Sequence, residues 1–319
     1  MAKKVLFRTD GSSEIGMGHL VRCFSIAKML STDFEISFYS RIVPNSFIND
    51  LKRAGFRYYS LNSDEELLSI IKEGDITVID NYQLGIEYHQ KIRKRNVKLV
   101  CIDDIHDKQF DADLIINHSP FVKPSDYKSK AYTKFLLGID YALLRPSFLT
   151  GALQNRKVDN LNSVFICFGG ADPNNYTFSV LNACVSNNIF KRINVVTGVT
   201  YLHSNSLTTI SDKRLNFYSS LNEKEMFDLM SSSSLAIVPA SGTLYEVLAA
   251  GCLVMSGYYV DNQKNIYEGF KKMSAFFDLN KFEDLDIIKN ISLNHFSSLN
   301  RNVIDGLSSV RIVKSFKKL

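Results

Sequence analysis

The chain has 319 residues, of which 45% are hydrophobic and 22% are charged, and its formal net charge is +5. At about 150 residues per domain, this length predicts about two domains, each able to bury a core without disulfides or metal ions. With 6 prolines and 16 glycines, the composition excludes fibrous and low-complexity proteins. The mild excess of 38 basic over 33 acidic residues predicts no nucleic-acid partner.

The five cysteines show no C-x-x-C spacing, which predicts reduced thiols. The first apolar run is too short for a signal peptide, and no apolar stretch approaches the length of about 18 residues that a transmembrane helix needs. We therefore expect a cytoplasmic protein without an integral membrane segment.

Short apolar runs alternate with helical patterns in the first half of the chain. Continuous apolar runs suit strands of a parallel sheet that helices cover on both faces. The expected strands are 5–9, 35–39, 57–61, 76–80, 98–103 and 114–117. The expected helices are 20–30, 45–54, 63–72 and 85–95.

The second half repeats this alternation after a polar stretch, 147–162, that we interpret as a linker. Its expected strands are 164–168, 194–197, 215–218, 235–238 and 253–258. Its expected helices are 176–185, 223–230, 244–250 and 265–272, with a further helical pattern at 283–291. The sequence thus predicts an α/β protein with two Rossmann-like βα domains, 1–150 and 151–319, and a ligand at the carboxyl ends of the strands.

Two helix starts have the spacing of a capping box, in which two side chains satisfy each other's backbone N–H groups. The pairs are Ser63 with Glu66 and Asn222 with Glu225.

The first expected strand leads into a segment with Arg8, Asp10, Gly16, Gly18 and His19. Glycines at 16 and 18 let a ligand approach the backbone, and the next helix offers free N–H groups to an anion. His19 falls at the helix start. A tight turn with a capping histidine is the structural alternative.

Two further strand ends in the second half have the composition of a phosphate-binding turn. Gly169, Gly170 and Asp172 follow the strand 164–168. The small and hydroxyl residues that follow the strand 235–238 are Ser241, Gly242 and Thr243, with Glu246 one helical turn later. Backbone N–H groups at such helix starts bind phosphates. Ordinary glycine turns and helix caps, with Glu246 on the surface, are the structural alternatives.

Other ionisable residues give weaker signals. The run Asp103-Asp104 with His106-Asp107 lacks metal-ligand spacing, so we expect no metal. The stretch Asp80-Asn81-Tyr82 ends the strand 76–80 and is a candidate to line the ligand site, with a turn or helix cap as the structural alternative. We expect His89, His203 and His295 on the surface, whereas His118, which follows a strand end, is a weak candidate for the site.

Taken together, these segments resemble the nucleotide-sugar enzymes of GT-B architecture, and more narrowly the UDP-sugar hydrolases of pseudaminic acid biosynthesis. The resemblance extends from residue 5 to about residue 270. It rests on Arg8-x-Asp10 through Gly16-x-Gly18-His19, Cys101-Ile-Asp-Asp104, Tyr141-Ala-Leu-Leu-Arg145, Phe168-Gly-Gly-x-Asp172, Ala240-Ser-Gly-Thr-Leu-x-Glu246 and Tyr259-x-x-Asn262-Gln263.

The resemblance implies hydrolysis of a UDP-linked 2,4-diacetamido-2,4,6-trideoxy sugar to UDP and the free sugar, without a metal or other cofactor, for surface glycan biosynthesis. It implies an interdomain cleft and a final helix, within 301–317, that crosses back to the first domain. It makes His19 the general base for water and Asn262 a polar positioner beside it. It places the diphosphate on the two glycine turns and ribose on Glu246, with Gln263 also at the substrate and Arg8, Asp10 and Asn81 on the sugar side.

Two other classes of function share these features. A GT-B glycosyltransferase would use the same UDP pocket with His19 activating an acceptor hydroxyl. A sugar-nucleotide-binding protein would need the pocket but no catalytic histidine.

Overall fold

The computed structural model describes residues 3–12, 14–170, 172–198 and 200–319. The chain divides into two compact units, which we describe separately. The first unit is Met1–Pro146 with Leu307–Leu319, and the second unit is Ser147–Gly306. The chain therefore leaves the first unit after residue 146 and returns to it at residue 307.

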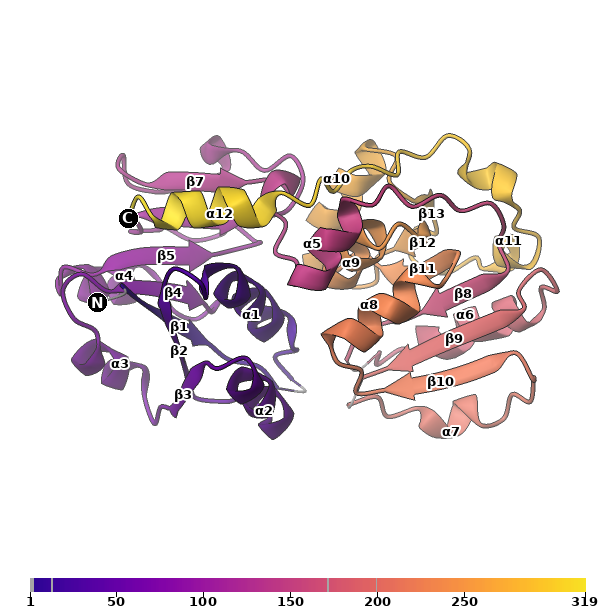
Figure 1. Ribbon diagram of the computed structural model, residues 1–319, viewed down its shortest axis with the longest axis horizontal. Helices are drawn as coiled ribbons and strands as arrows, with labels where there is room; N and C mark the ends of the chain where they lie inside the picture. Colours follow the sequence, from indigo (N-terminus) through magenta and orange to yellow (C-terminus); the bar gives the residue numbers. More distant parts are fainter. Residues whose placement is uncertain (1–2, 13, 171, 199) are drawn as a thin grey trace. The chain divides into compact units, whose positions relative to one another are not determined.

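A parallel sheet of seven strands forms the centre of the first unit, in the order β3-β2-β1-β4-β5-β6-β7 (Figure 1). Its strands are β1 Lys4–Thr9, β2 Glu35–Ser40, β3 Arg57–Ser60, β4 Ile76–Asp80, β5 Lys98–Ile102, β6 Leu114–Asn117 and β7 Lys134–Leu137. The order reverses between β1 and β4, so that their carboxyl ends form a topological switch point, where open α/β sheets bind ligands.

Helices connect the first five of these parallel strands, and a further helix of this unit follows the second unit. They are α1 Gly18–Leu30, α2 Asn45–Arg53, α3 Asp64–Ile70, α4 Ile86–Arg93 and, at the end of the chain, α12 Ser308–Phe316. The short 3₁₀ turns η1 Pro124–Asp126 and η2 Ile139–Tyr141 belong to the same unit. Continuous burial of strand residues such as Val5, Phe7 and Val78 explains the unbroken apolar runs of the sequence.

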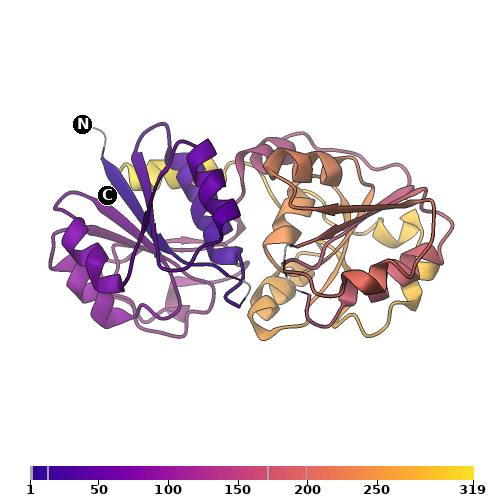
Figure 2. The ribbon, with the colours of Figure 1, turned by 90° about the horizontal axis from the view of Figure 1, so that it is seen from below.

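Helix α12 lies beside α1 in both ribbon views (Figures 1 and 2). Phe316 meets Phe34 edge to face at 6.3 Å between ring centroids. Lys317 pairs with Asp33 at 2.6 Å, and the Ser308 hydroxyl donates to the carbonyl of Ala142. These contacts make residues 308–317 an integral part of the first unit.

The second unit contains a parallel sheet of six strands in the order β10-β9-β8-β11-β12-β13. Its strands are β8 Ser163–Ile166, β9 Arg192–Thr197, β10 Leu215–Ser219, β11 Leu235–Pro239, β12 Leu253–Gly257 and β13 Phe277–Asp278. Its helices are α6 Tyr176–Val185, α7 Ser204–Leu207, α8 Glu223–Ser231, α9 Gly242–Ala249, α10 Lys264–Lys272 and α11 Asp286–Lys289, with the turns η3 Asp261–Gln263 and η4 Leu293–Phe296. Here the switch point lies between β8 and β11.

The predicted fold class is confirmed, and several local predictions are corrected. Strands β7 and β13 were not predicted. The expected linker contains helix α5, Pro146–Ala152. The capping box at Asn222 forms, with Glu225 N–H donating to Asn222 and Asn222 N–H to Glu225. The one at Ser63 does not, because Glu66 accepts the N–H of Asn62 instead.

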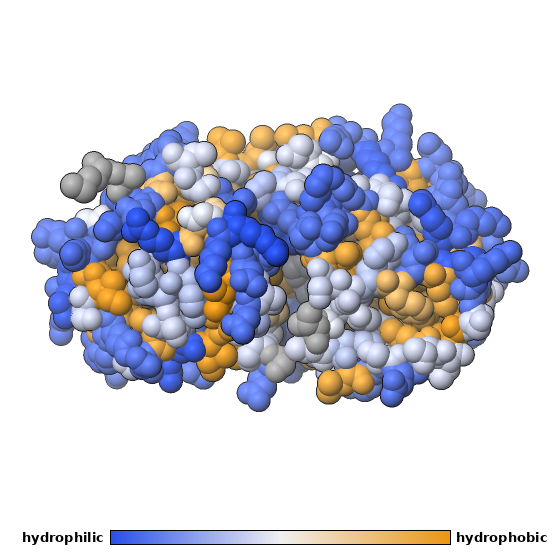
Figure 3. Space-filling model, turned by 60° about the horizontal axis from the view of Figure 1, so that its bottom comes forward, coloured by the Kyte–Doolittle hydropathy of each residue, from blue (hydrophilic) through white to orange (hydrophobic). Residues whose placement is uncertain are grey.

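The surface carries isolated hydrophobic side chains among polar ones. On the face drawn in Figure 3, apolar residues form several separate patches, which is the ordinary state of a protein surface. Among the helices of the described residues, none combines the length and the apolar character that crossing a membrane requires.

Candidate active site

The switch point of the first sheet brings together His19 and Asp80, which are 61 positions apart. His19 is the second residue of α1, and Asp80 is the last residue of β4. Both side chains are buried, at 7% and 1% residue exposure. The site therefore lies where the topology of a doubly wound sheet predicts a ligand.

Asp80 orients the imidazole ring of His19. The Nδ1 atom lies 2.6 Å from Asp80 Oδ1. Because an ionised carboxylate can only accept, we assign the proton to Nδ1, which leaves a lone pair on Nε2. In the described part of the chain, Nε2 has no hydrogen-bond partner. The pair thus has the arrangement of a general base backed by a carboxylate.

The guanidinium of Arg22, one helical turn after His19, binds the same carboxylate with one edge of its fork. Nε donates to Asp80 Oδ2 at 2.5 Å, and Nη2 donates to Oδ1 at 2.7 Å. Nη1 donates to Asp104 Oδ2 at 2.5 Å. The Tyr82 hydroxyl in turn donates to Asp104 at 2.8 Å, and its ring meets the His19 ring edge to face at 4.6 Å.

These ion pairs determine the charge of the site. Burial alone would raise the pKa of Asp80, but the charges of Arg22 and His19 outweigh it and lower that pKa to about 2. Burial also opposes ionisation of Asp104, yet Arg22 holds the pKa of Asp104 below its ordinary value. Both carboxylates are therefore ionised at neutral pH.

Arg8 and Asp10, candidates for the sugar side, belong to an internal network. Arg8 is 1% exposed, and its Nη2 pairs with Asp10 at 2.7 Å and with Asp64 at 2.6 Å. Asp10 Oδ1 accepts the backbone N–H groups of Arg41 and of residue 42. In the structure these two residues fix the loops beside the site.

Asn81 is tied to this network by both ends of its amide. Its Nδ2 donates to Asp10 Oδ2 at 3.2 Å, and its Oδ1 accepts the N–H of Gln83 at 2.7 Å. The amide therefore holds the loop after β4 against the loop after β1.

Gly16 and Gly18 shape the turn that enters α1. Gly16 has φ +84°, a left-handed conformation that favours glycine. Gly18 is the first residue of α1, and a Cβ atom there would meet open space. The helix has no side-chain cap at Met17, so its first N–H groups remain available at the positive end of the helix dipole.

In the second unit, the turn after β8 contains Gly169 and Gly170. Gly169 has φ +83°. The Gly170 carbonyl accepts the hydroxyl of Thr200 at 2.7 Å. A Cβ on Gly198 would lie only 2.4 Å from the Gly170 Cα, so this close approach of two loops requires glycine.

Asp172 caps helix α6. Its two oxygens accept the N–H groups of Tyr176 at 2.9 Å and Thr177 at 2.7 Å. The side chain is buried at 2% residue exposure. The first turn of α6 is thus already bound to a carboxylate of the protein itself.

The start of α9 differs from that of α6. Ser241 is its N-cap residue but makes no side-chain cap. Gly242 is exposed with open space around it, and Thr243 is half-buried. Uncapped N–H groups therefore stand at a helix start in the loop after β11, beside the switch point of the second sheet.

Glu246, one turn further along α9, is 9% exposed. Burial raises the pKa of Cys167 to about 11, and the nearby charges of Glu246 and Asp172 act in the same direction. The loops after β8 and β11 thus lie close together and share this acidic neighbourhood.

Asn262 and Gln263 form most of the short turn η3. Asn262 is exposed, whereas Gln263 is 7% exposed and accepts the N–H of Tyr259 at 3.0 Å. The Tyr259 hydroxyl donates to the Phe168 carbonyl at 3.2 Å. Gln263 therefore fastens this turn to the strand end that precedes Gly169.

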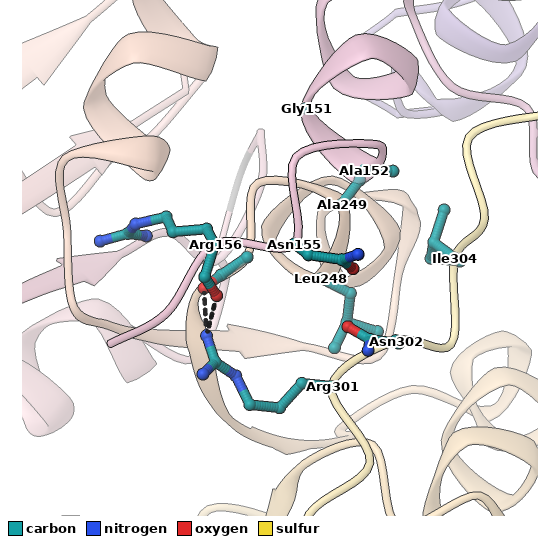
Figure 4. A pocket seen from close by; sticks show the side chains of 10 residues that line it. Gly151, Ala152, Asn155, Arg156, Leu248, Ala249, Arg301, Asn302 and Ile304 are labelled. Carbon is teal, nitrogen blue, oxygen red and sulfur yellow. Dashed lines mark hydrogen bonds between the residues drawn. The ribbon is translucent and has the colours of Figure 1, made fainter. Parts of the chain in front are cut away.

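A small pocket lies at the other end of α9, beside Leu248 and Gly251 (Figure 4). Arg301 Nη2 donates there to the carbonyls of Arg156 at 2.8 Å and of Gly251 at 2.9 Å. The side chain joins three chain segments, so its role is structural. The helix length of eight residues separates this pocket from the uncapped start of α9 by about 12 Å.

Sequence reasoning named Asp80 and Tyr82 as part of a strand end that could line the site, but it did not predict their contacts with the histidine cluster, and it missed Arg22. Arg22 had a signal, since a position three residues after His19 shares its helix face. Asp104 and Tyr82 follow neighbouring strands. His118, after β6, accepts the N–H of Leu143 at 3.1 Å, and burial lowers the pKa of His118 to about 4.

Within the described residues, no group of three His, Cys, Asp or Glu side chains could hold a metal ion.

No family model matches the chain. Among curated proteins, it is 29% identical over 269 residues to the UDP-2,4-diacetamido-2,4,6-trideoxy-beta-L-altropyranose hydrolase of Campylobacter jejuni, covering 82% of this chain and 94% of that protein. It is 27% identical over 282 residues to the spore coat polysaccharide biosynthesis protein SpsG of Bacillus subtilis, covering 85% and 81%.

Two solved structures share the fold. MurG of Acinetobacter baumannii superposes with a TM-score of 0.61 at 12% identity, with all of both chains covered. An Anabaena protein, HepE, in complex with UDP and glucose gives 0.62 at 14% identity, covering 99% of this chain and 98% of that one. The two parallel Rossmann-like sheets and these likenesses show that the chain has the GT-B fold.

Proposed function

We propose that this protein hydrolyses a UDP-sugar to UDP and the free sugar, with His19 as the general base that activates water. The observation that carries the proposal is the buried pair of His19 and Asp80, with Nδ1 held by the carboxylate at 2.6 Å. Similarity to the Campylobacter jejuni hydrolase supports both the reaction and a 2,4-diacetamido-2,4,6-trideoxy sugar as the substrate class.

In the proposed mechanism, Nε2 of His19 takes a proton from water as the water oxygen attacks the anomeric carbon. The C–O bond to UDP breaks, and the electron pair leaves with the diphosphate. The proton arriving at Nε2 makes the ring positive, and Asp80 stabilises that charge through the Nδ1–H bond. Asn262 positions the sugar or the water.

The second unit supplies the donors for the leaving group. Uncapped N–H groups of Gly242 and Thr243, the Ser241 hydroxyl, and the turn at Gly169 and Gly170 bind the diphosphate. Glu246 accepts the ribose hydroxyls. The UDP bound to the structurally similar Anabaena protein supports a nucleotide-binding role for this fold. Since these donors come from backbone and hydroxyl groups, we propose that turnover needs no metal.

The test is to incubate the protein with the UDP-sugar alone and to measure released UDP and free sugar. Hydrolysis requires both products in equal amounts without an acceptor. His19→Asn should lower kcat by a factor of about 10² to 10⁴ with little change in UDP affinity. The matched control is His295→Asn, which alters a half-buried histidine of η4 and should keep full activity.

The same assay distinguishes the alternatives. A glycosyltransferase would release UDP only after an acceptor is added. A binding protein would retain the UDP-sugar unchanged. Full hydrolysis by His19→Asn would remove this histidine from the mechanism.

A further inference from the structure

Two groups compete for the Nδ1 atom of His19. Asp80 Oδ1 lies 2.6 Å away and can only accept a hydrogen bond. Arg22 Nη2 lies 3.0 Å away and can only donate one. If Nδ1 carries the proton, Nε2 keeps its lone pair and can act as a base. If Arg22 donates to Nδ1, the proton moves to Nε2, which then becomes a donor.

The direction of the Arg22 guanidinium decides this competition. Its Nε and Nη2 already donate to Asp80, and its Nη1 donates to Asp104 at 2.5 Å. With both edges of the planar guanidinium bound to carboxylates, Nη2 stays directed at Asp80 Oδ1 although it also lies 3.0 Å from Nδ1. Asp104 is the acceptor that fixes the second edge, so removing it lets the guanidinium rotate and lets Nη2 exchange its bond to Asp80 for one to Nδ1.

Asp104 also acts through charge and through Tyr82. With Asp80 and Asp104 ionised against Arg22, a proton on His19 brings the cluster to neutrality. Without Asp104, the same proton would leave a net positive charge in a buried place, which disfavours protonation. Tyr82 donates to both oxygens of Asp104, at 2.8 and 3.0 Å, while its ring contacts the His19 ring.

We propose that Asp104 is a positioning residue that holds Arg22 and Tyr82 so that Nδ1–H of His19 points to Asp80 and the Nε2 lone pair stays available. This inference rests on the proposed function for the role of Nε2 as a base. The tautomer of the His19 ring does not depend on that function. Charged or titratable groups surround the His19 ring and its carboxylate partner. They come from α1, β4 and the loops after β4, β5 and β6, and they are Arg22, Cys23, Asp80, Tyr82, Asp104 and His118.

The first experiment observes the ring directly. The chain has six histidines, so ¹⁵N-histidine labelling and long-range ¹H–¹⁵N spectra, with His19 assigned through His19→Asn, report the tautomer near neutral pH. The native protein should show the Nδ1–H form of His19. Asp104→Asn should shift the population toward the Nε2–H form, and Asp104→Glu, which keeps the charge, should shift it less.

The second experiment measures kinetics with the UDP-sugar. Asp104→Asn should lower kcat by roughly 10- to 100-fold with KM within about twofold, since the substitution misaligns the base while Asp104 itself does not bind substrate. The acid limb of its pH–rate profile should move to lower pH because a nearby negative charge is lost. Tyr82→Phe, which keeps the carboxylate, should leave that limb in place.

The matched control is Asp113→Asn. Asp113 is a similarly buried carboxylate of the same unit that pairs with Arg93 and Lys98, at 2.5 and 3.0 Å, at the opposite end of the sheet before β6. Its substitution should change neither the tautomer of His19 nor the acid limb.

An Asp104→Asn protein with the native tautomer and the native pH profile would overturn the inference, and so would equal effects from Asp113→Asn. If Asp104→Asn fails to fold, Asp104→Glu and Tyr82→Phe decide, because unchanged spectra in both would refute the positioning role. A native protein that releases no UDP would refute the proposed function instead, while the spectra would still test Asp104.

Discussion

Replacing Asp80 by asparagine tests the electrostatics of the first unit. The substitution keeps the size of the side chain but removes the charge that faces Arg22 and His19. The buried guanidinium then loses a bidentate acceptor, and the Nδ1–H of His19 meets an amide that can equally present a donor. We therefore expect a loss of stability and of activity together.

The size of the stability loss follows from the pKa of Asp80, which falls from its ordinary 3.8 to about 2 on folding. At about 1.4 kcal/mol per pKa unit, the ionised carboxylate contributes about 2.5 kcal/mol at neutral pH. Because the folded pKa is the lower one, the unfolded chain binds the proton more readily between pH 4 and 2. This contribution is therefore present above about pH 4 and disappears as the pH falls toward 2.

The assay is urea unfolding followed by hydrogen exchange of peptides from β1 and β4, which report on the first unit. Asp80→Asn should be less stable than the native protein by about 2 to 3 kcal/mol at pH 7, and the difference should narrow toward pH 2.5. A difference that is absent at pH 7, or equally large at both pH values, would refute this reasoning. UDP release should fall by a factor of about 10² or more.

Three further predictions concern the second unit and the chemistry. Glu246→Ala should weaken UDP binding by about 1.5 to 3 kcal/mol in calorimetric titration, and unchanged affinity would refute its contact with ribose. Turnover should survive excess EDTA; activity lost in chelator and restored by Mg²⁺ or Mn²⁺ would show that a metal takes part. Gly198→Ala should destabilise the second unit by about 1 to 3 kcal/mol in urea, because its Cβ would lie 2.4 Å from the Gly170 Cα; a variant of native stability would show that the two loops can separate.

Most of the sheet could be predicted because parallel strands covered by helices appear as unbroken apolar runs. Strands β7 and β13 were missed for a physical reason. β13 has two residues, and both strands lie at sheet edges, where half-exposed residues interrupt the apolar pattern. His89 was expected on the surface because it follows polar residues, yet it is 1% exposed and stacks near Phe110.

At the site, the glycine turn and His19 could be predicted because a strand end, two glycines and a helix start are adjacent in sequence. The partners of His19 could not. Asp80 and Asp104 reach Arg22 across 58 and 82 positions, and only the strand order brings β1, β4 and β5 together. The adjacent Asp103 and Asp104 suggest a shared role, but Asp103 accepts from Tyr127 and from the backbone of residue 106.

The position of α12 has a consequence for how the protein is made. A ribosome completes the sheet of the first unit by residue 137 but does not add Phe316, which packs on Phe34, until the whole second unit has been synthesised. Until then, the apolar surface that α12 covers stays exposed to water and to chaperones. The second unit, a continuous stretch from 147 to 306, can fold first. Completion of the first unit thus waits for the synthesis of α12.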